Sequence, residues 1–462
     1  MKIRMTKWLV TAVLFLIVSL FFEVAAADSP AVTVIAAAND ASLAEIVVTA
    51  SRVARDIQSE PSAIYRLDTT AGTFQEADRT MPEMLDGVPS IMVQKTSYGQ
   101  SSPYLRGFTG YRTLCMVDGV RLNNSVFRSG PNQYWNTVDP LAIERSEVVM
   151  GPGSVLYGSD AIGGVLNAMT LNPPGWNGKE AWGSHLYYRG SSAEDSNVGR
   201  VQVGGRISEN IGLTAGYSVK GFGDLRGGRD VGLQEHTGYD ERDVDAKANY
   251  YLSSYSTLTI AHQSTRQDDV WRTHRTVYGV EWEGLAHGSD KVESYDQRRD
   301  LTYMRYAAEK IGGFVNGLEV TLSRHAQGED MYRVKKDDKS ERYSFDAETW
   351  GGTFQVRSES LLGQWMYGVD YYHDIVDSFG RKYKADGSLE KTEIQGIVAD
   401  DASYDTAGVF AQDTISFLDG WLDIIPGFRW TSISVAADKV KDPVRGNTIS
   451  LSDGWDAVAG SL

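Results

Sequence analysis

Residues Leu141 to Thr170, LAIERSEVVMGPGSVLYGSDAIGGVLNAMT, decide the fold of this chain. An apolar strand pattern runs directly into glycines at positions 151, 153, 158, 163 and 164, where backbones can approach one another closely. Such a segment is suited to lie inside another structure. A nucleotide-binding loop at Gly151-Pro152-Gly153-Ser154 is the alternative. However, the loop lacks the third glycine of a dinucleotide fingerprint and the Lys-Ser/Thr of a phosphate loop, and Pro152 removes a backbone donor that a phosphate would need.

A second segment, Tyr104 to Asn124 (YLRGFTGYRTLCMVDGVRLNN), follows the same logic. Apolar Leu114, Met116 and Val120 alternate with smaller or polar residues, and Asp118-Gly119 supplies a hairpin turn. Together the two segments predict a small glycine-rich domain of strands and loops.

Three motifs in these segments resemble the plug of TonB-dependent outer-membrane receptors: Leu105-Arg106-Gly107, Val117 to Val120, and Ile143 to Gly164. The segment Gly408 to Arg429 similarly resembles a barrel hairpin of that family. The resemblance implies an all-β, antiparallel transmembrane barrel with an N-terminal α+β plug. It assigns residues 51–175 to the plug and 176–462 to a partial barrel.

The N-terminus has the pattern of a secretory signal peptide. Lys2, Arg4 and Lys7 precede an apolar run from Trp8 to Phe22, and Ala25-Ala26-Ala27 predicts cleavage after residue 27. A membrane anchor is the weaker alternative, because a spanning helix needs about 20 apolar residues. The mature chain would have a net charge of about −18, which argues against general nucleic-acid binding.

From Trp182 onward, one parity of residues is apolar or aromatic and the other is small or polar, which is the period of a membrane barrel. In one segment, Trp365, Tyr367, Val369 and Tyr371 are expected to face outward and Asp370 inward. Eleven strands are predicted, at 182–190, 198–207, 211–222, 243–253, 256–266, 300–311, 316–327, 343–358, 362–376, 404–417 and 421–433.

The connections between these strands alternate between short and long. The long ones are 223–242, 267–299, 328–342 and 377–402, as expected for extracellular loops opposite short periplasmic turns. A passive porin or an adhesion barrel would show the same pattern. The plug of roughly 140 residues has no place in a passive pore, so the sequence favours a gated receptor.

Eleven strands are about half of the 22 that the resemblance implies, and an odd number leaves unpaired edges in lipid. The sequence also stops at Gly460-Ser461-Leu462, without a terminal aromatic strand. We therefore expect a C-terminally incomplete receptor that does not transport by itself.

Residues Asp28 to Ala44 are small and polar enough for a periplasmic linker. The next six, Glu45-Ile46-Val47-Val48-Thr49-Ala50, resemble the TonB box, and their β-branched run is suited to join the edge of a partner sheet. The first structural strand of the plug is the alternative. The resemblance implies TonB as a partner, with ExbB and ExbD, and outer-membrane lipid around the barrel.

Candidate ligand contacts are expected in two plug loops that point outward, 98–103 and 123–136, and in the long barrel loops. Aromatic faces beside amide and guanidinium donors would suit an anionic ferric chelate, although the same aromatics would also pack the plug against the barrel wall. The candidates are Tyr98, Phe127, Arg128, Asn132, Gln133, Tyr134 and Trp135.

The resemblance favours a ferric siderophore or a related small iron complex as cargo, with haem and cobalamin as alternatives. Haem receptors of the family often use a plug histidine, but all seven histidines here follow residue 184. Iron would be held by its chelator, so we expect no cofactor and no protein metal site. Motifs of hydrolases and metalloproteases are also missing from the sequence, which argues against an enzyme.

Arg106 and Arg145 are expected to lock the plug to inward-facing carboxylates of the barrel, because buried charges need partners. Ordinary surface charge is the alternative. Many plugs of the family have arginine before the Gly-Pro, where this chain has Met150. The only cysteine, Cys115, cannot form an intramolecular disulfide.

Overall fold

The computed structural model of the protein describes residues 46–47, 52, 55–68, 77–174, 182–229, 231–281, 283–284, 286–359, 363–418 and 421–462. The predicted signal peptide at 1–27, the linker at 28–44 and four residues of the predicted TonB box lie outside these ranges. Within them, no helix is both long and apolar enough to cross a membrane.

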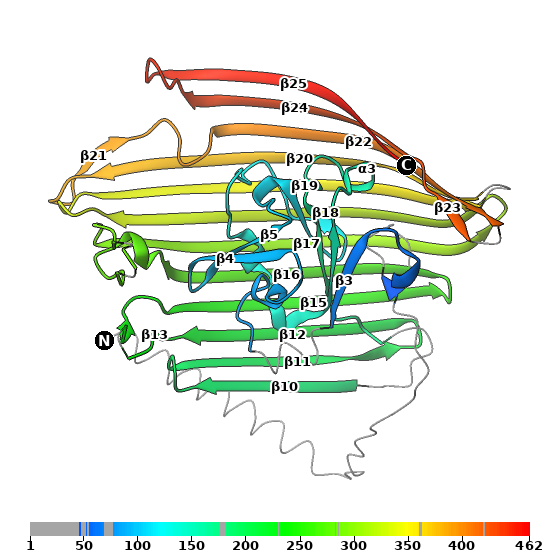
Figure 1. Ribbon diagram of the computed structural model, residues 1–462, viewed down its shortest axis with the longest axis horizontal. Coiled ribbons are helices and arrows are strands. Elements are labelled where there is room, and N and C mark those ends of the chain that lie inside the picture. The colour runs from blue at the N-terminus through cyan, green and yellow to red at the C-terminus, as the bar shows by residue number, and fades with distance from the viewer. Residues whose placement is uncertain are drawn as a thin grey trace, which may run out of the picture. The chain divides into compact units, whose positions relative to one another are not determined.

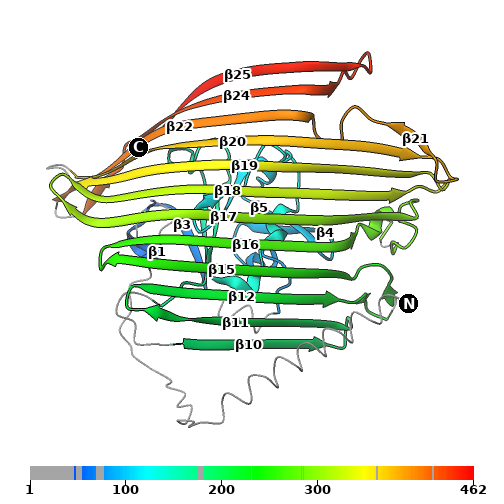
Figure 2. The same ribbon diagram turned by 180° about the vertical axis from the view of Figure 1, so that it is seen from behind.

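A single 14-stranded antiparallel sheet accounts for most of the described chain (Figures 1 and 2). Neighbours in sequence are neighbours in the sheet along its continuous path, and β10 and β25 form its two edges without pairing with each other. The long strands are β10 Trp182–Ser191, β11 Ser196–Ser208, β12 Ile211–Phe222, β15 Tyr239–Ser253, β16 Ser256–Trp271, β17 Val292–Gly312, β18 Val315–Val334, β19 Ser340–Glu359, β20 Gly363–Tyr383, β22 Asp400–Phe417, β24 Gly427–Lys441 and β25 Thr448–Ser461. Two short pieces complete the sheet, β21 Leu389–Thr392 and β23 Leu422–Ile424.

Each predicted strand range overlaps an observed strand, but the prediction was wrong in two respects. Strands such as β17 and β22 begin several residues before the predicted positions 300 and 404. Polar residues near these ends weaken the apolar period while backbone pairing continues. The strand β25 was not predicted at all, because Asp453 interrupts its apolar parity. The continuous path therefore has twelve strands in the described residues, not eleven.

The predicted parity of the wall is confirmed in β20. Trp365, Val369 and Tyr371 are exposed on the outer face, whereas Asp370 is buried on the inner face. Asp370 accepts two hydrogen bonds from the guanidinium of Arg429 on β24, at 2.7 and 2.8 Å. The inner face therefore carries paired charges, as expected where apolar residues face lipid.

The long connections all lie at one end of the strands and the short turns at the other (Figure 1). The loop after β12 contains the hairpin β13 Leu225–Arg226 and β14 Leu233–Gln234, and the loop after β16 contains the single turn η6 Thr273–Arg275. This asymmetry was predicted and is confirmed for the connections within 223–242, 267–299 and 377–402. The predicted long loop 328–342 was wrong, because β18 and β19 pair as far as Val334 and Ser340, and only residues 335–339 connect them at the same end.

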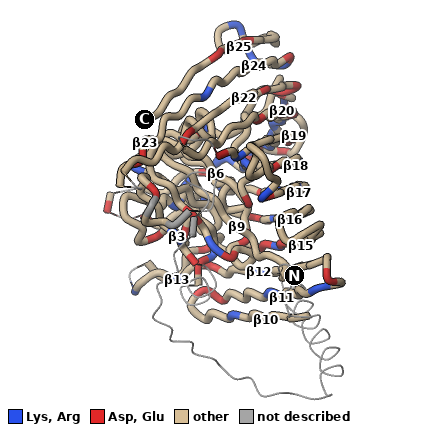
Figure 3. Tube along the Cα trace, turned by 90° about the vertical axis from the view of Figure 1, so that its right-hand side faces the viewer, with Lys and Arg blue, Asp and Glu red and all other residues tan. Residues whose placement is uncertain are grey.

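The residues before β10 form a separate set of strands against one face of the large sheet (Figures 1 and 3). A five-stranded sheet has the order β3-β8-β9-β6-β7 and is antiparallel except between β6 and β9. Its strands are β3 Ala63–Asp68, β6 Thr113–Val117, β7 Val120–Arg121, β8 Ile143–Met150 and β9 Gly164–Thr170. Two hairpins accompany it, β4 Ile91–Ser97 with β5 Gln100–Leu105, and β1 Ile46–Val47 with β2 Arg55–Asp56. Short helical turns are η1 Ile57–Ser59, η2 Glu83–Leu85, η3 Gly110–Arg112, η4 Tyr134–Thr137, η5 Pro140–Ala142 and α3 Ser154–Tyr157.

The segments 104–124 and 141–170 both contribute to the core of this N-terminal domain. Leu105, Val117 and Val148 are fully buried together, and the core continues into Leu301 on β17. A side chain at Gly164 would collide with the carbonyl oxygen of Val149 and with Leu105. The glycine is therefore required by close approach of two backbones, as the sequence predicted.

Candidate ligand-binding site

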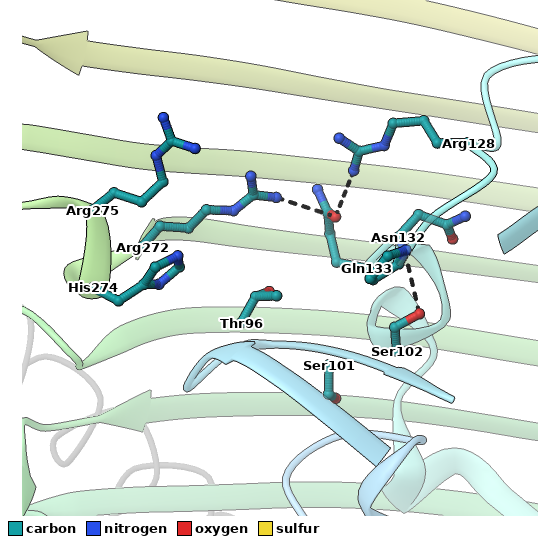
Figure 4. Close-up of a pocket in the computed structure, with 10 residues that line it drawn as sticks. Thr96, Ser101, Ser102, Arg128, Asn132, Gln133, Arg272, His274 and Arg275 are labelled. Carbon is teal, nitrogen blue, oxygen red and sulfur yellow. Dashed lines mark hydrogen bonds between the residues drawn. The ribbon is translucent and has the colours of Figure 1, made fainter. Parts of the chain in front are cut away.

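A cavity of about 130 Å³ lies between the N-terminal domain and the loop that follows β16 (Figure 4). It is at the end of the strands that carries the long loops, because Arg272 and η6 come directly after β16. The lining residues are Thr96, Ser101, Ser102, Arg128, Pro131, Asn132, Gln133, Arg272, His274 and Arg275.

Hydrogen bonds between the β4–β5 hairpin and the segment before η4 shape the floor of this cavity. The Ser102 hydroxyl accepts from the Asn132 backbone N–H at 3.2 Å. The Ser101 hydroxyl donates to the Asn136 side chain at 2.9 Å, and the Asn136 amide donates back to the Ser101 carbonyl at 3.1 Å. The hairpin therefore fixes the positions of the polar side chains that reach the cavity.

The cavity is electropositive. Three arginines line it, and its lining residues in the described chain include no carboxylate. The guanidinium of Arg272 lies 4.2 Å from the centre of the Tyr295 ring, and its Nε donates to Gln100 Oε1 at 2.9 Å. Glu293, which does not line the cavity, pairs with Arg275 at 3.0 Å and with Arg272 at 4.0 Å. The arrangement can hold an anionic group by charge-assisted hydrogen bonds.

Two further side chains, Asn132 and His274, add hydrogen-bonding groups for a ligand at this cavity. Asn132 is buried and, in the part of the chain that the structure describes, its Nδ2 has no hydrogen-bond partner, so it leaves a donor for a ligand oxygen. Burial, together with the neighbouring charge of Arg272, lowers the pKa of His274 below its ordinary value. His274 is therefore neutral at pH 7 and offers a donor or an acceptor without charge.

The seven candidate contacts fall into two groups. Arg128, Asn132 and Gln133 line the cavity, whereas Tyr98, Phe127, Tyr134 and Trp135 do not. The four aromatic residues are buried in packing, which was the alternative weighed for them. Tyr98 meets the rings of Phe222 and Tyr239 edge-on, Tyr134 meets Phe345 in the same way and also contacts Phe127, and Trp135 belongs to the core of the N-terminal domain.

Sequence reasoning missed most of the cavity wall, namely Thr96, Ser101, Ser102, Pro131, Arg272, His274 and Arg275. Ser101 and Ser102 belong to the plug loop 98–103, and Pro131 to the loop 123–136, both of which were expected to point outward. A signal for Arg272, His274 and Arg275 was present in the predicted long loop 267–299, where a histidine lies between two arginines. Position along the sequence does not reveal that this loop meets the tip of the N-terminal domain.

Charged contacts between the N-terminal domain and the large sheet centre on two aspartates. Asp139 accepts from Lys220 at 2.7 Å, from Arg200 at 3.3 Å and from Ser218 at 2.6 Å. Although burial opposes ionisation, Lys220 and Arg200 hold the pKa of Asp139 below its ordinary value. This carboxylate is therefore charged and fully paired at neutral pH.

The carboxylates of Asp139, Glu241 and Asp243 lie close enough together to hold a metal ion. However, the Lys220 ammonium contacts all three, including Asp243 at 3.0 Å. A lysine therefore occupies the position that a cation would take.

Asp118, in the turn between β6 and β7, makes the second charged contact. It accepts from Lys247 at 3.2 Å, from the Tyr303 hydroxyl at 2.9 Å, and from both the backbone and the hydroxyl of Thr170. Burial opposes ionisation here too, but Lys247 and Thr170 hold the pKa of Asp118 below its ordinary value.

The predicted locks have different surroundings in the structure. Arg145 pairs with Glu147 of its own strand at 3.2 Å, and Arg106 is exposed. Neither forms an ion pair with the large sheet in the described residues.

At Asp118 and Asp139 the observed polarity is the reverse of the expected one, because the N-terminal domain supplies the carboxylates and the sheet supplies the cations. Arg79 has the expected polarity, since it pairs with Glu194 of the β10–β11 turn at 4.0 Å. Asp118 had been attributed to the geometry of the hairpin turn alone, and no pattern in the sequence singled out Asp139.

Comparison with known proteins agrees with this geometry. Residues 56–165 match the family model described as TonB-dependent Receptor Plug Domain, and residues 170–460 match TonB dependent receptor-like, beta-barrel. The vitamin B12 transporter BtuB of Photobacterium profundum is 26% identical over 358 residues, which cover 76% of this chain and 53% of that protein. The vitamin B12 transporter BtuB of Vibrio vulnificus is 32% identical over 219 residues, 45% of this chain and 31% of that protein.

Among solved structures, the siderophore receptor PiuA from Acinetobacter baumannii is similar with a TM-score of 0.67 at 13% identity, over 88% of this chain and 62% of that one. At this identity the likeness concerns the fold alone. The chain spans about half the length or less of the two curated relatives.

Proposed function

Because the chain belongs to the TonB-dependent receptor family, we propose that it serves the uptake of a ferric siderophore or a similar anionic iron complex. Membership of the family places the chain in the outer membrane, among transport receptors and not among enzymes. The observation that carries the proposal is the electropositive cavity, where Arg128, Arg272 and Arg275 meet the unpaired donor of Asn132. Ferric chelates commonly present carboxylate or phenolate oxygens, which such donors recognise.

The proposal includes an energy source, because an outer membrane pierced by porins holds no useful ion gradient. TonB, driven by ExbB and ExbD, would pull on a TonB box at residues 45–50, behind a signal peptide at 1–27 and a linker at 28–44. The pull would act on the plug, residues 51–175, within the barrel that begins at 176. In the structure Ile46 and Val47 pair with Asp56 and Arg55, so the box would exchange this short pairing for the edge of a TonB sheet.

Uptake of a labelled ferric chelate tests the proposal. Cells without their own iron receptors and expressing this protein are expected to bind the label at their surface, and a protonophore should abolish any accumulation beyond that binding. The variant Arg128→Ala/Arg272→Ala should lower the apparent affinity for the chelate by about tenfold or more, the effect of losing charge-assisted hydrogen bonds. Accumulation that persists with the protonophore would instead identify a passive pore.

A corrinoid is the second candidate cargo, and the curated relatives favour it, because both are vitamin B12 transporters. Cyanocobalamin added in excess should leave uptake of the ferric chelate unchanged if an iron complex is the cargo. Haem, the other alternative, is tested in the same competition. The three competing compounds are the unlabelled ferric chelate, cyanocobalamin and haem. If only one of them displaces the labelled chelate, that compound identifies the class of ligand.

A further inference from the structure

A buried polar belt runs along the inner face of five neighbouring strands, β12 and β15 to β18. Each strand contributes one residue at the same level, so that every residue lies directly opposite the next. The inner belt consists of Lys220, Glu241, Gln267, Gln297 and Glu329, all at most 3% exposed. Gln267 donates to Glu241 and Gln297 donates to Glu329, both at 2.7 Å, and Lys220 contacts Glu241.

One short segment of the plug, residues 133–139, lies across this belt. We call it the docking strip. At one end Gln133 donates to Glu329, and at the other Asp139 binds Lys220. Between them, the Asn136 carbonyl accepts from Gln267 at 3.3 Å. The strip is thus held by two hydrogen-bonded groups of the belt, Gln297 with Glu329 at the Gln133 end, and Lys220, Glu241 and Gln267 at the other end.

Gln133 belongs to the docking strip and to the ligand cavity at the same time. Its carbonyl oxygen accepts from Arg128 at 3.0 Å and from Arg272 at 3.4 Å, inside the cavity (Figure 4). Its amide nitrogen donates in the opposite direction, to Glu329 of the inner belt. Its backbone carbonyl accepts from Asn136 N–H at 3.0 Å and so begins the η4 turn.

We propose that Gln133 transmits occupancy of the cavity to the docking strip. The inference rests on the proposed function, since it takes the cavity as the ligand site. An anionic ligand oxygen is a stronger acceptor for a guanidinium than the neutral carbonyl of an amide. A ligand that draws Arg128 and Arg272 toward itself therefore removes both donors from the Gln133 side chain.

A buried carbonyl without donors is unfavourable, so Gln133 reorients and its hydrogen bond to Glu329 weakens. The first contact of the strip with the wall is then lost, and the η4 turn opens from that end. Arg275 provides an internal comparison, because it lines the same cavity and pairs with Glu293, as Arg272 also does, but in the described residues it makes no hydrogen bond to Gln133.

Hydrogen–deuterium exchange of the full chain tests the proposal without any ligand. In Arg128→Ala/Arg272→Ala, the backbone amide of Asn136 is expected to exchange about tenfold faster than in the wild type, the effect of losing about one buried hydrogen bond. Gln133→Met should give a similar increase, and the milder Gln133→Asn covers the case in which the methionine variant fails to fold. The matched control Arg275→Ala should leave exchange at residues 134–139 unchanged.

Citrate, a tricarboxylate, is the probe for the ligand-dependent arm. It should accelerate exchange at Asn136 in the wild type and have no further effect in Gln133→Met. Equal exchange in the wild type and the double arginine variant would overturn the proposal, as would an equal increase in Arg275→Ala. Uptake is measured separately from hydrogen–deuterium exchange. If the protein takes up the ferric chelate but exchange in the docking strip does not change, the role of Gln133 is rejected and the proposed function is not.

Discussion

Asp139 joins the plug to the wall through a buried carboxylate with three partners on two strands. Replacement by asparagine keeps the shape but removes the charge that balances Lys220 and Arg200. We expect Asp139→Asn to lower the stability of the docked plug by about 3 kcal/mol, as is usual when a buried ion pair is broken. Urea titration followed by exchange in the docking strip measures the change.

Asp68→Asn is the matched control, since Asp68 is exposed and, among the described residues, forms an ion pair only with Arg66 two residues away. Pairs of this kind contribute about 1 kcal/mol or less. Equal effects of the two substitutions would contradict the role of Asp139 as the lock.

Low pH is expected to release the plug, because it protonates the buried carboxylates of Asp118 and Asp139. The pKa values of Asp118 and Asp139 are lowered in the folded protein, so their contribution to stability is complete above about pH 4, the ordinary value of an aspartate. It is lost as the pH falls from there through the lowered values. Exchange in the docking strip is therefore expected to increase below about pH 4, and Asp118→Asn/Asp139→Asn should flatten this limb of the pH profile. An unchanged acid limb would show that other groups control release.

Residues of the candidate site could be predicted only where the chemistry is local. The donors Arg128, Asn132 and Gln133 were identified from one segment rich in polar and aromatic side chains. Arg272 and His274 were not, because their place at the cavity depends on which loop lies over the plug. The polarity of the lock also depends on contacts between distant residues, which no local pattern encodes.

At the scale of elements, a substitution in strand β1 tests whether the segment 45–50 acts as a TonB box. A proline at Val47 cannot donate to the ladder of a partner sheet. Val47→Pro is therefore expected to abolish capture of the full chain by the TonB C-terminal domain in a pull-down. Capture equal to that of the wild type would mean that Ile46–Val47 is only the structural strand that pairs with β2.

The strands of the large sheet were the most predictable elements, because their period is set by lipid on one side and polar groups on the other. Their outer ends were less predictable. In β17, for example, Val292 to Arg299 carries charged and polar residues on both faces, yet it pairs along its length with β16 and β18. Backbone hydrogen bonds therefore continue a strand beyond the residues whose side chains alternate between apolar and polar.

At the scale of the whole molecule, the outer face of the sheet predicts where lipid lies. Val369 is 46% exposed in the middle of β20, and arginine there should cost about 2–4 kcal/mol in a bilayer. Phe379 has the same parity near the long-loop end of β20 and is similarly exposed, so Phe379→Arg should cost about 1 kcal/mol or less. Guanidinium titration in lipid compares the two variants, and equal costs would place Val369 outside the hydrocarbon layer.

The order of strands in the plug also has a mechanical consequence. β3 is the edge strand of the five-stranded sheet and pairs only with β8, from Ala63 opposite Met150 to Asp68 opposite Arg145. It is also the first strand of that sheet to follow the segment on which TonB would pull. A force from the N-terminus can therefore unzip β3 one hydrogen bond at a time, while β8, β9 and β6 remain paired. The next strand of this sheet along the chain, β6, has a neighbour on each side, so extracting it would break two pairings where extracting β3 breaks one.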